Sequence, residues 1–331
     1  MIERALVRAA RAWRTVAGNH SALERRIKRR YRRAMRKDSG RHADHFSNQH
    51  AVVVRAKEAP DPKIGIFLKG GCDLPSLFLA GPMIRDNLRQ GTVAIFRPPD
   101  SVGSSQSAQL LQTLAGIPDG LVEETCRRLR IPRSFFQPVL FQPNFEVRAL
   151  PNAPAFPKTV AVLSIGSDLT RSLHRHRQHG FLVDIGGWWL NQSLDKAIQD
   201  MEAVRWFKET FEPVGKIDVA DFQENFGRVI RELESRGSNV IVFNTLELDP
   251  LSPIHNYQLQ NQAHSTRRRE FNLALTELSA KLNFHVVDVD RLLKLQGIRE
   301  QVDFAHTPAE AKLPIAREGC RILRELGVVG A

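Results

Sequence analysis

The sequence predicts an α/β protein of three layers, in which helices cover both faces of a parallel sheet of five strands. The first observation is a set of five short apolar runs, each bounded by glycine, proline or polar residues. The second is that segments with helical spacing separate these runs. Alternation of buried strands with helices is typical of parallel sheets covered on both faces. Because ligands bind such sheets at the carboxyl ends of the strands, the residues after each apolar run are the candidates for a functional site.

The five expected strands are rich in valine, isoleucine, leucine and phenylalanine. We expect them over residues 64–68, 92–96, 159–165, 239–244 and 284–289. Helical spacing predicts helices over residues 77–88, 105–130, 169–178, 221–236, 266–282 and 313–326. The connection formed by residues 131–157 is rich in proline and phenylalanine, which indicates an irregular crossing.

The basic residues gather at the amino end of the chain. Residues 1–50 hold 14 of the 48 basic residues but only 4 of the 36 acidic ones, so they carry most of the net charge of +12. We therefore expect a basic helical arm and linker over residues 1–58 and one α/β domain over residues 59–331. Residues 1–37 are candidates for binding an anionic membrane surface or nucleic acid. The alternative is a solvated arm with no partner, and nothing indicates an obligate protein partner.

Several classes of protein do not fit the composition. No apolar run approaches the roughly 20 residues that span a bilayer, and basic residues interrupt every apolar stretch of the arm, unlike a secretory signal. The cysteines Cys72, Cys126 and Cys320 are too widely spaced to suggest a disulfide framework or a zinc site. The glycine patterns of dinucleotide and nucleoside triphosphate sites are absent. We expect no cofactor or metal and a cytoplasmic location, at the membrane periphery if the arm binds lipid.

An Asp-x-x-His pattern follows the last expected strand and precedes the last expected helix. In a loop, Asp303 can accept a hydrogen bond from Nδ1 of His306, which leaves Nε2 free to take a proton from a nucleophile. The plainer interpretation of such a pair is a solvated turn, and it is the flanking strand and helix that favour a catalytic role.

With these loops placed, residues 63–327 resemble the SGNH/GDSL hydrolase family. The strand that ends in Gly166-Ser167-Asp168 is similar to the family's third block, and Asp303 to His306 is similar to its fifth. The resemblance implies a flavodoxin-like sheet and ester hydrolysis by a nucleophile, a histidine and an aspartate, without a metal. The chain departs from the family pattern in two places: it has no Gly-Asp-Ser, and Ser167 stands where the family has an oxyanion-binding Asn.

Two residues compete for the place of the missing nucleophile. Aligned by the end of the first strand, Cys72 takes the position of the family's serine, and Ser76 lies one helical turn further on. A cysteine at a strand-to-helix turn faces backbone N–H groups, which favours the thiolate. The alternative for Cys72 is a small buried core residue. By the resemblance, Gly71 and Gly103 are candidates for the oxyanion hole.

Further polar residues close the expected strands. We expect Ser167 and Asp168 to contribute to oxyanion or substrate binding, although Asp168 could instead cap the following helix. Asn244, at the end of the fourth strand, is a candidate for the lining of a polar pocket.

The sequence as a whole favours an SGNH-type esterase or acyltransferase that acts on an acyl ester of a polar small molecule such as a carbohydrate. Two hypotheses from other classes stay open. The fold could serve a binding protein that has lost the nucleophile, or the basic arm could be the active part of a membrane- or nucleic-acid-associated adaptor.

Overall fold

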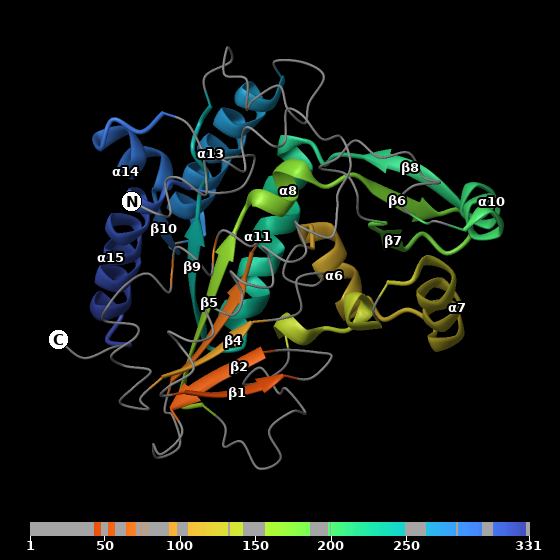
Figure 1. The fold of residues 1–331 in the computed structure, drawn as a ribbon, viewed down its shortest axis with the longest axis horizontal. Coiled ribbons are helices and arrows are strands. Elements are labelled where there is room, and N and C mark those ends of the chain that lie inside the picture. The colour runs from red at the N-terminus through yellow and green to blue at the C-terminus, as the bar shows by residue number, and fades with distance from the viewer. Residues whose placement is uncertain are drawn as a thin grey trace, which may run out of the picture. The chain divides into compact units, whose positions relative to one another are not determined.

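A computed structural model describes most of the chain beyond residue 63 and two strands before it (Figure 1). The described residues are 43–47, 52–56, 64–70, 74, 78, 93–97, 105–131, 133–141, 156–185, 198, 200–248, 263–282, 284–299 and 307–328. The chain divides into two compact units, Met1–Ala43 and Asp44–Ala331. The second unit holds the sheets and the helices that cover them.

The main sheet contains seven strands in the order β1-β2-β4-β3-β5-β9-β10. They span Ala43–Ser47 (β1), Val52–Ala56 (β2), Ile64–Lys69 (β3), Val93–Arg97 (β4), Lys158–Ser164 (β5), Ser238–Phe243 (β9) and His285–Val287 (β10). β3 pairs in parallel with β4 and β5, β5 with β9, and β9 with β10, whereas β2 is antiparallel to β4. The α/β class is confirmed. The expected sheet of five strands is wrong in its extent, because two strands from within the expected arm and linker join its edge.

The strand order reverses at β3, the first of the parallel strands along the chain. β3 lies between β4, the next parallel strand, and β5, the one after that. The chain therefore leaves β3 toward one side of the sheet and later returns on the other. Such a switch point leaves a crevice at the carboxyl ends of the two strands where ligands bind in open α/β sheets. The last residue of β3, Lys69, is in register with Leu163 of β5.

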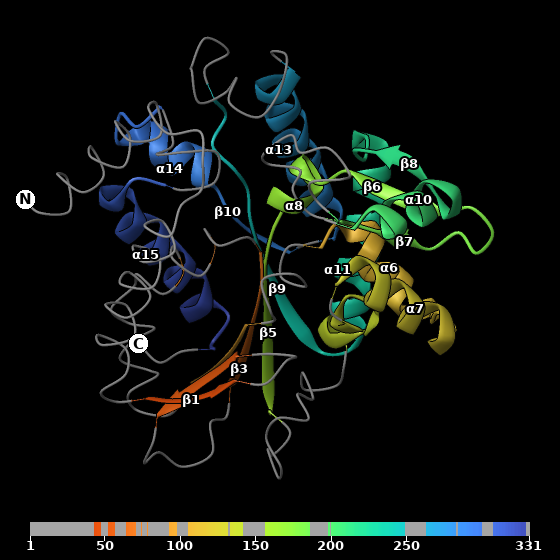
Figure 2. The same ribbon diagram turned by 45° about the vertical axis from the view of Figure 1, so that its right-hand side comes forward.

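Alternating side chains of the central strands enter two separate cores. Phe67, Ala161 and Leu163 face a cluster with α6 (Ser107–Ala115), α11 (Val219–Ser235) and α13 (Ala263–Leu282). Their neighbours along the strands, including Leu68 and Val162, face a second cluster with α14 (Val289–Leu295) and α15 (Ala309–Glu325). Figure 2 shows α14 and α15 on one face of the sheet and α6, α11 and α13 on the other. The alternation is what a strand covered on both sides requires.

A second, antiparallel sheet was not predicted. It has the order β7-β6-β8, formed by Leu182–Val183, Leu173–His176 and Phe211–Gly215. It packs with α7 (Asp119–Leu129) and α10 (Met201–Thr210) around a third core cluster, to the right in Figure 1. The helix expected over residues 169–178 is wrong, because helix α8 ends at Thr170 and β6 follows. His176 explains the strand: it is buried against Phe181 and Phe211, with ring centroids 4.8 and 5.0 Å away.

The remaining elements agree with or refine the expectations. The helices over 105–130, 221–236, 266–282 and 313–326 are present as α6 with α7, α11, α13 and α15. The connection expected to be irregular contains two short 3-10 turns, Arg133–Phe136 and Val139–Phe141. The helix expected over 77–88 lies, apart from Phe78, outside the described residues. In the described part of the chain, every helix is too short or too polar to cross a bilayer.

Candidate functional site

Six of the predicted site residues lie outside the described residues. They are Gly71, Cys72, Ser76, Gly103, Asp303 and His306. The structure does describe the ends of the neighbouring strands, which carry the other predicted residues, Ser167, Asp168 and Asn244.

Lys69 closes β3 and is the charged residue among the largest fully buried side chains of the described residues. It points toward α6 because it is two residues after Phe67, and alternate side chains of a strand share a face. Its side chain is 1% exposed, and its Nζ has no hydrogen-bond partner in the described part of the chain. Burial lowers the pKa of Lys69, while the nearby carboxylate of Asp168 opposes that shift. A buried ammonium without hydrogen bonds is costly, so its retention here needs a physical reason.

Gly70 brings the end of β3 against its neighbours. A Cβ atom at this position would lie 2.6 Å from Cδ2 of Leu74 and 2.9 Å from Oγ of Ser164. Real Cβ atoms do not approach that closely, so only glycine fits here. Gly70 itself therefore packs directly against the end of β5.

Asp168 connects the end of β5 to the start of α6. Its side chain is fully buried, and Oδ1 accepts hydrogen bonds from the backbone N–H of Ser107, at 2.8 Å, and from the Ser107 hydroxyl. The carboxylate therefore caps α6 and not α8, the helix that it lies in and that the sequence suggested. Burial raises the pKa of Asp168, an effect opposed by Lys69 and by the two bonds from Ser107. Its Oδ2 has no hydrogen-bond partner among the described residues.

Arg267 binds the backbone around Asp168 through its guanidinium. Its guanidinium donates to the carbonyl oxygens of Asp168, Leu169 and Ile217, at 2.9, 2.9 and 2.5 Å. It also stacks on Phe271, with 4.2 Å between its central carbon and the ring centroid. Arg267 begins a run of three arginines near the start of α13, a pattern that is also typical of a solvated helix face. A run of arginines at a helix start carries no signal that separates the two roles.

A buried ion pair is formed by Arg171, the residue that directly follows α8. Arg171 donates to the carboxylate of Asp184, and both side chains are almost completely buried. Arg171 also acts on Lys69 as a like charge and lowers its pKa further. Because Asp184 already pairs with Arg171, Asp168 is the described carboxylate whose charge acts on Lys69.

Ser167 and Ser164 complete the polar surroundings of Asp168. Ser167 lies in α8, Gly166–Thr170, and is buried. Ser164 is the last residue of β5, and its buried Oγ has no hydrogen-bond partner in the described part of the chain. Among the residues that the structure describes, three polar atoms around the ends of β3 and β5 thus have no hydrogen-bond partner: Nζ of Lys69, Oδ2 of Asp168 and Oγ of Ser164.

Asn244 has a different environment at the end of β9. Its Nδ2 donates to Asp288, at 2.9 Å, and its Oδ1 accepts from the N–H of Asp290, at 3.2 Å. Asp290 in turn accepts from the N–H of Glu247, at 2.8 Å. These contacts fasten the start of α14 to β9.

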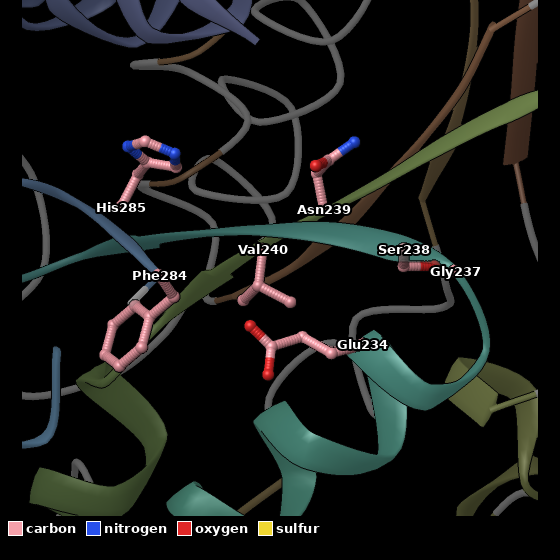
Figure 3. A pocket seen from close by; sticks show the side chains of 7 residues that line it. All are labelled: Glu234, Gly237, Ser238, Asn239, Val240, Phe284 and His285. Atoms are coloured by element: carbon pink, nitrogen blue, oxygen red, sulfur yellow. The ribbon is translucent and has the colours of Figure 1, made fainter. Parts of the chain in front are cut away.

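A cavity of about 300 Å³ lies at the opposite edge of the sheet (Figure 3). It is lined by Glu234, Gly237, Ser238, Asn239, Val240, Phe284 and His285. These residues belong to the amino ends of β9 and β10 and to the end of α11. No predicted site residue lines this cavity, and we do not assign the candidate site to it.

Comparison with known proteins gives only distant likenesses. No family model matches the chain, and no curated protein matches it either. Among solved structures, phospholipase A1 from Streptomyces albidoflavus NA297 is 10% identical, with a TM-score of 0.36, over 77% of this chain and 97% of its own. Axe2, an acetylxylan esterase from Geobacillus stearothermophilus, is 11% identical, with a TM-score of 0.33, over 81% and 95%. Similarity of this degree leaves the family of the chain open, so the case for a function rests on the residues of the site.

Proposed function

We propose that the chain is a hydrolase or acyltransferase that acts on an acyl ester of a polar small molecule such as a carbohydrate. The observation that carries the proposal is the group of buried, unpartnered polar atoms around the ends of β3 and β5. Lys69 and Asp168 belong to it, and it lies at the switch point of the parallel sheet. Buried polar atoms without partners are rare in folded proteins and gather at functional sites.

The sequence supplies reactive groups for the same edge of the sheet. In this proposal Cys72 or Ser76 is the nucleophile, His306 is the general base, and Asp303 orients the imidazole. The backbone N–H groups of Gly71 and Gly103, with Ser167, are the proposed oxyanion donors. No metal or cofactor is required for this chemistry.

The test is hydrolysis of a short-chain p-nitrophenyl ester and of acetylated saccharides by the full chain. His306→Ala should abolish turnover, whereas His285→Ala, at the opposite edge of the sheet, should leave it unchanged. Cys72→Ala and Ser76→Ala decide between the two nucleophiles, and Cys126→Ala is the control for a thiol-reactive inhibitor. An unaltered rate in both Cys72→Ala and Ser76→Ala would exclude this catalytic mechanism.

A second candidate is a binding protein that keeps the fold without catalysis. It is favoured by the use of Asp168 as a cap for α6 and by Ser167 in place of an oxyanion-binding Asn. This candidate predicts that an acetylated saccharide raises the melting temperature of the chain and is recovered intact after prolonged incubation.

A further inference from the structure

Burial of the Lys69 ammonium is costly, and none of the described residues offsets that cost with a hydrogen bond. Its ammonium could donate three hydrogen bonds but donates none within the described part of the chain. Asp168 acts on it through space, yet the two share no hydrogen bond. Asp168 is moreover engaged by Ser107, and Arg267 acts on it as a second cation. The positive charge of Lys69 is therefore only partly compensated.

The position of Lys69 matches a need of the proposed reaction. It ends β3 and directly precedes the glycines before Cys72. When a nucleophile adds to the ester carbonyl carbon, the π electron pair of the carbonyl moves to its oxygen and forms an alkoxide. Donors fixed at that oxygen lower the barrier, and loss of one donor lowers the rate by about 10²–10³. Ser167, in the neighbouring helix α8, has a shorter side chain than an Asn, so a further donor beside it would strengthen the stabilisation of this oxygen.

We propose that Lys69 is the electrostatic stabiliser of this oxyanion, with Asp168 as its positioning residue, an inference that rests on the proposed function. The Nζ–H donates a hydrogen bond to the alkoxide and keeps its proton. When the carbonyl re-forms, the bond to the alcohol breaks, and the leaving oxygen takes its proton from the general acid. Lys69 is thus unchanged over the cycle.

The experiment compares Lys69→Met, Lys69→Arg and a matched control, Lys158→Met, in the full chain. Lys158 opens β5 at the opposite edge of the sheet and is exposed, with its Nζ donating to the carbonyl of Gly327. Met has nearly the length of Lys but no charge. For ester hydrolysis by Lys69→Met we expect kcat to fall by about 10²–10³ with KM changed by less than about threefold. Lys69→Arg should recover part of this loss, and Lys158→Met should retain the wild-type kcat.

Stability separates this role from a merely structural one. Lys69→Met leaves the buried carboxylate of Asp168 without its counter-charge and should therefore lower the melting temperature, whereas Lys69→Met combined with Asp168→Asn removes both charges and should recover most of that loss. Both variants should share the fall in kcat. The kcat of the wild type should also fall at alkaline pH as Lys69 loses its proton, below the ordinary lysine pKa of 10.5, and Lys69→Arg should not show this fall.

Three outcomes would overturn the inference. One is a wild-type kcat in Lys69→Met. Another is a kcat that returns to the wild-type value together with the melting temperature when Lys69→Met is combined with Asp168→Asn, which would make Lys69 a structural residue. The third is activity that rises with pH through the pKa of Lys69, which would make it a base. If the wild type hydrolyses no ester at all, the proposed function fails, and this inference fails with it. If the wild type is active and Lys69→Met is equally active, only the role of Lys69 is rejected.

Discussion

Replacement of Asp168 tests whether the polar cluster holds the site together. The carboxylate accepts two hydrogen bonds from Ser107 and is the described acidic group that acts on Lys69. Asp168→Ala removes both bonds and the charge. Asp168→Asn keeps the shape and leaves Oδ1 able to accept, so it removes mainly the charge.

The expected magnitudes follow from these contacts. In Asp168→Ala the N–H and hydroxyl of Ser107 lose their acceptor in a buried place, and each unsatisfied group costs about 1–3 kcal/mol. Lys69 also loses its counter-charge, and breaking a buried charge pair costs about 3–5 kcal/mol. Because these contributions overlap, we expect the free energy of unfolding to fall by about 3–5 kcal/mol. In Asp168→Asn the acceptors for Ser107 become neutral and Lys69 again loses its counter-charge, so we expect a loss of about 2–4 kcal/mol, smaller than in Asp168→Ala.

Urea denaturation at about pH 7 measures these changes, with Asp221→Ala as the control. Asp221 is an exposed acidic residue in the first turn of α11, and its replacement should change stability by less than about 0.5 kcal/mol. The midpoint should shift without a change in the denaturant slope, since the fold is retained. A loss of less than about 1 kcal/mol in Asp168→Ala would refute the assignment of Asp168 as the cap of α6.

The charge contribution can be isolated in a double-mutant cycle. In a Lys69→Met background no buried cation remains to be left without its partner, so Asp168→Asn should cost less than in the wild type. Contacting residues usually differ from additivity by about 0.5–3 kcal/mol. Identical costs in the two backgrounds would show that Asp168 does not compensate Lys69.

Three further predictions concern the scaffold. Gly70→Ala should lower the free energy of unfolding by about 1–3 kcal/mol, because its Cβ would lie 2.6 Å from a leucine side chain. The control Gly166→Ala, whose Cβ would have its nearest contact at 3.7 Å, should lower it by less than about 1 kcal/mol. Burial and the charge of Arg267 lower the pKa of Lys216 to about 8. Between about pH 8 and the ordinary lysine pKa of 10.5, the folded state therefore binds fewer protons than the unfolded state, and the free energy of unfolding should rise with pH. An equal rise in Lys216→Met would contradict this assignment. Removal of residues 1–42 should leave the melting temperature nearly unchanged and abolish sedimentation with anionic vesicles or DNA, and a large loss of stability would show instead that the arm is part of the core.

The central strands were predictable because burial on both faces leaves a continuous apolar run. In β5 every residue from Thr159 to Ser164 is buried, and a short run of this kind is typical of a strand between two layers of helices. The edge strand β1 was missed because Ala43–Ser47 contains aspartate, histidine and serine and has the composition of a linker. β6 was missed because Leu173–His176 is basic and short, and its strand conformation depends on rings contributed by distant residues such as Phe211. The local sequence pattern of residues 173–176 carries no information about that contact.

The burial of long charged side chains could likewise not be predicted from the sequence. Lys69 follows an apolar run, where a lysine ordinarily marks the point at which a strand reaches solvent. Arg268 stands within an arginine run but is buried, and it donates to the hydroxyl of Thr245 and the carbonyl of Leu246, both at 2.9 Å. Both assignments require the position of other strand ends, which the local sequence does not specify.

The two polar groups at the carboxyl edge of the sheet differ in a way that separates scaffold from candidate site. Around Asn244, the side-chain amide and the neighbouring aspartates satisfy one another, so this group joins β9 to α14. Around Lys69 and Asp168, polar atoms that are more deeply buried than those around Asn244 are left without partners among the described residues. Folding alone favours satisfied groups, and a protein keeps unsatisfied ones mainly where a ligand or a reacting atom supplies the missing contact. This difference favours the ends of β3 and β5 as the place of the chemistry, and Cys72 and Ser167 each follow one of these strand ends by three residues in the sequence.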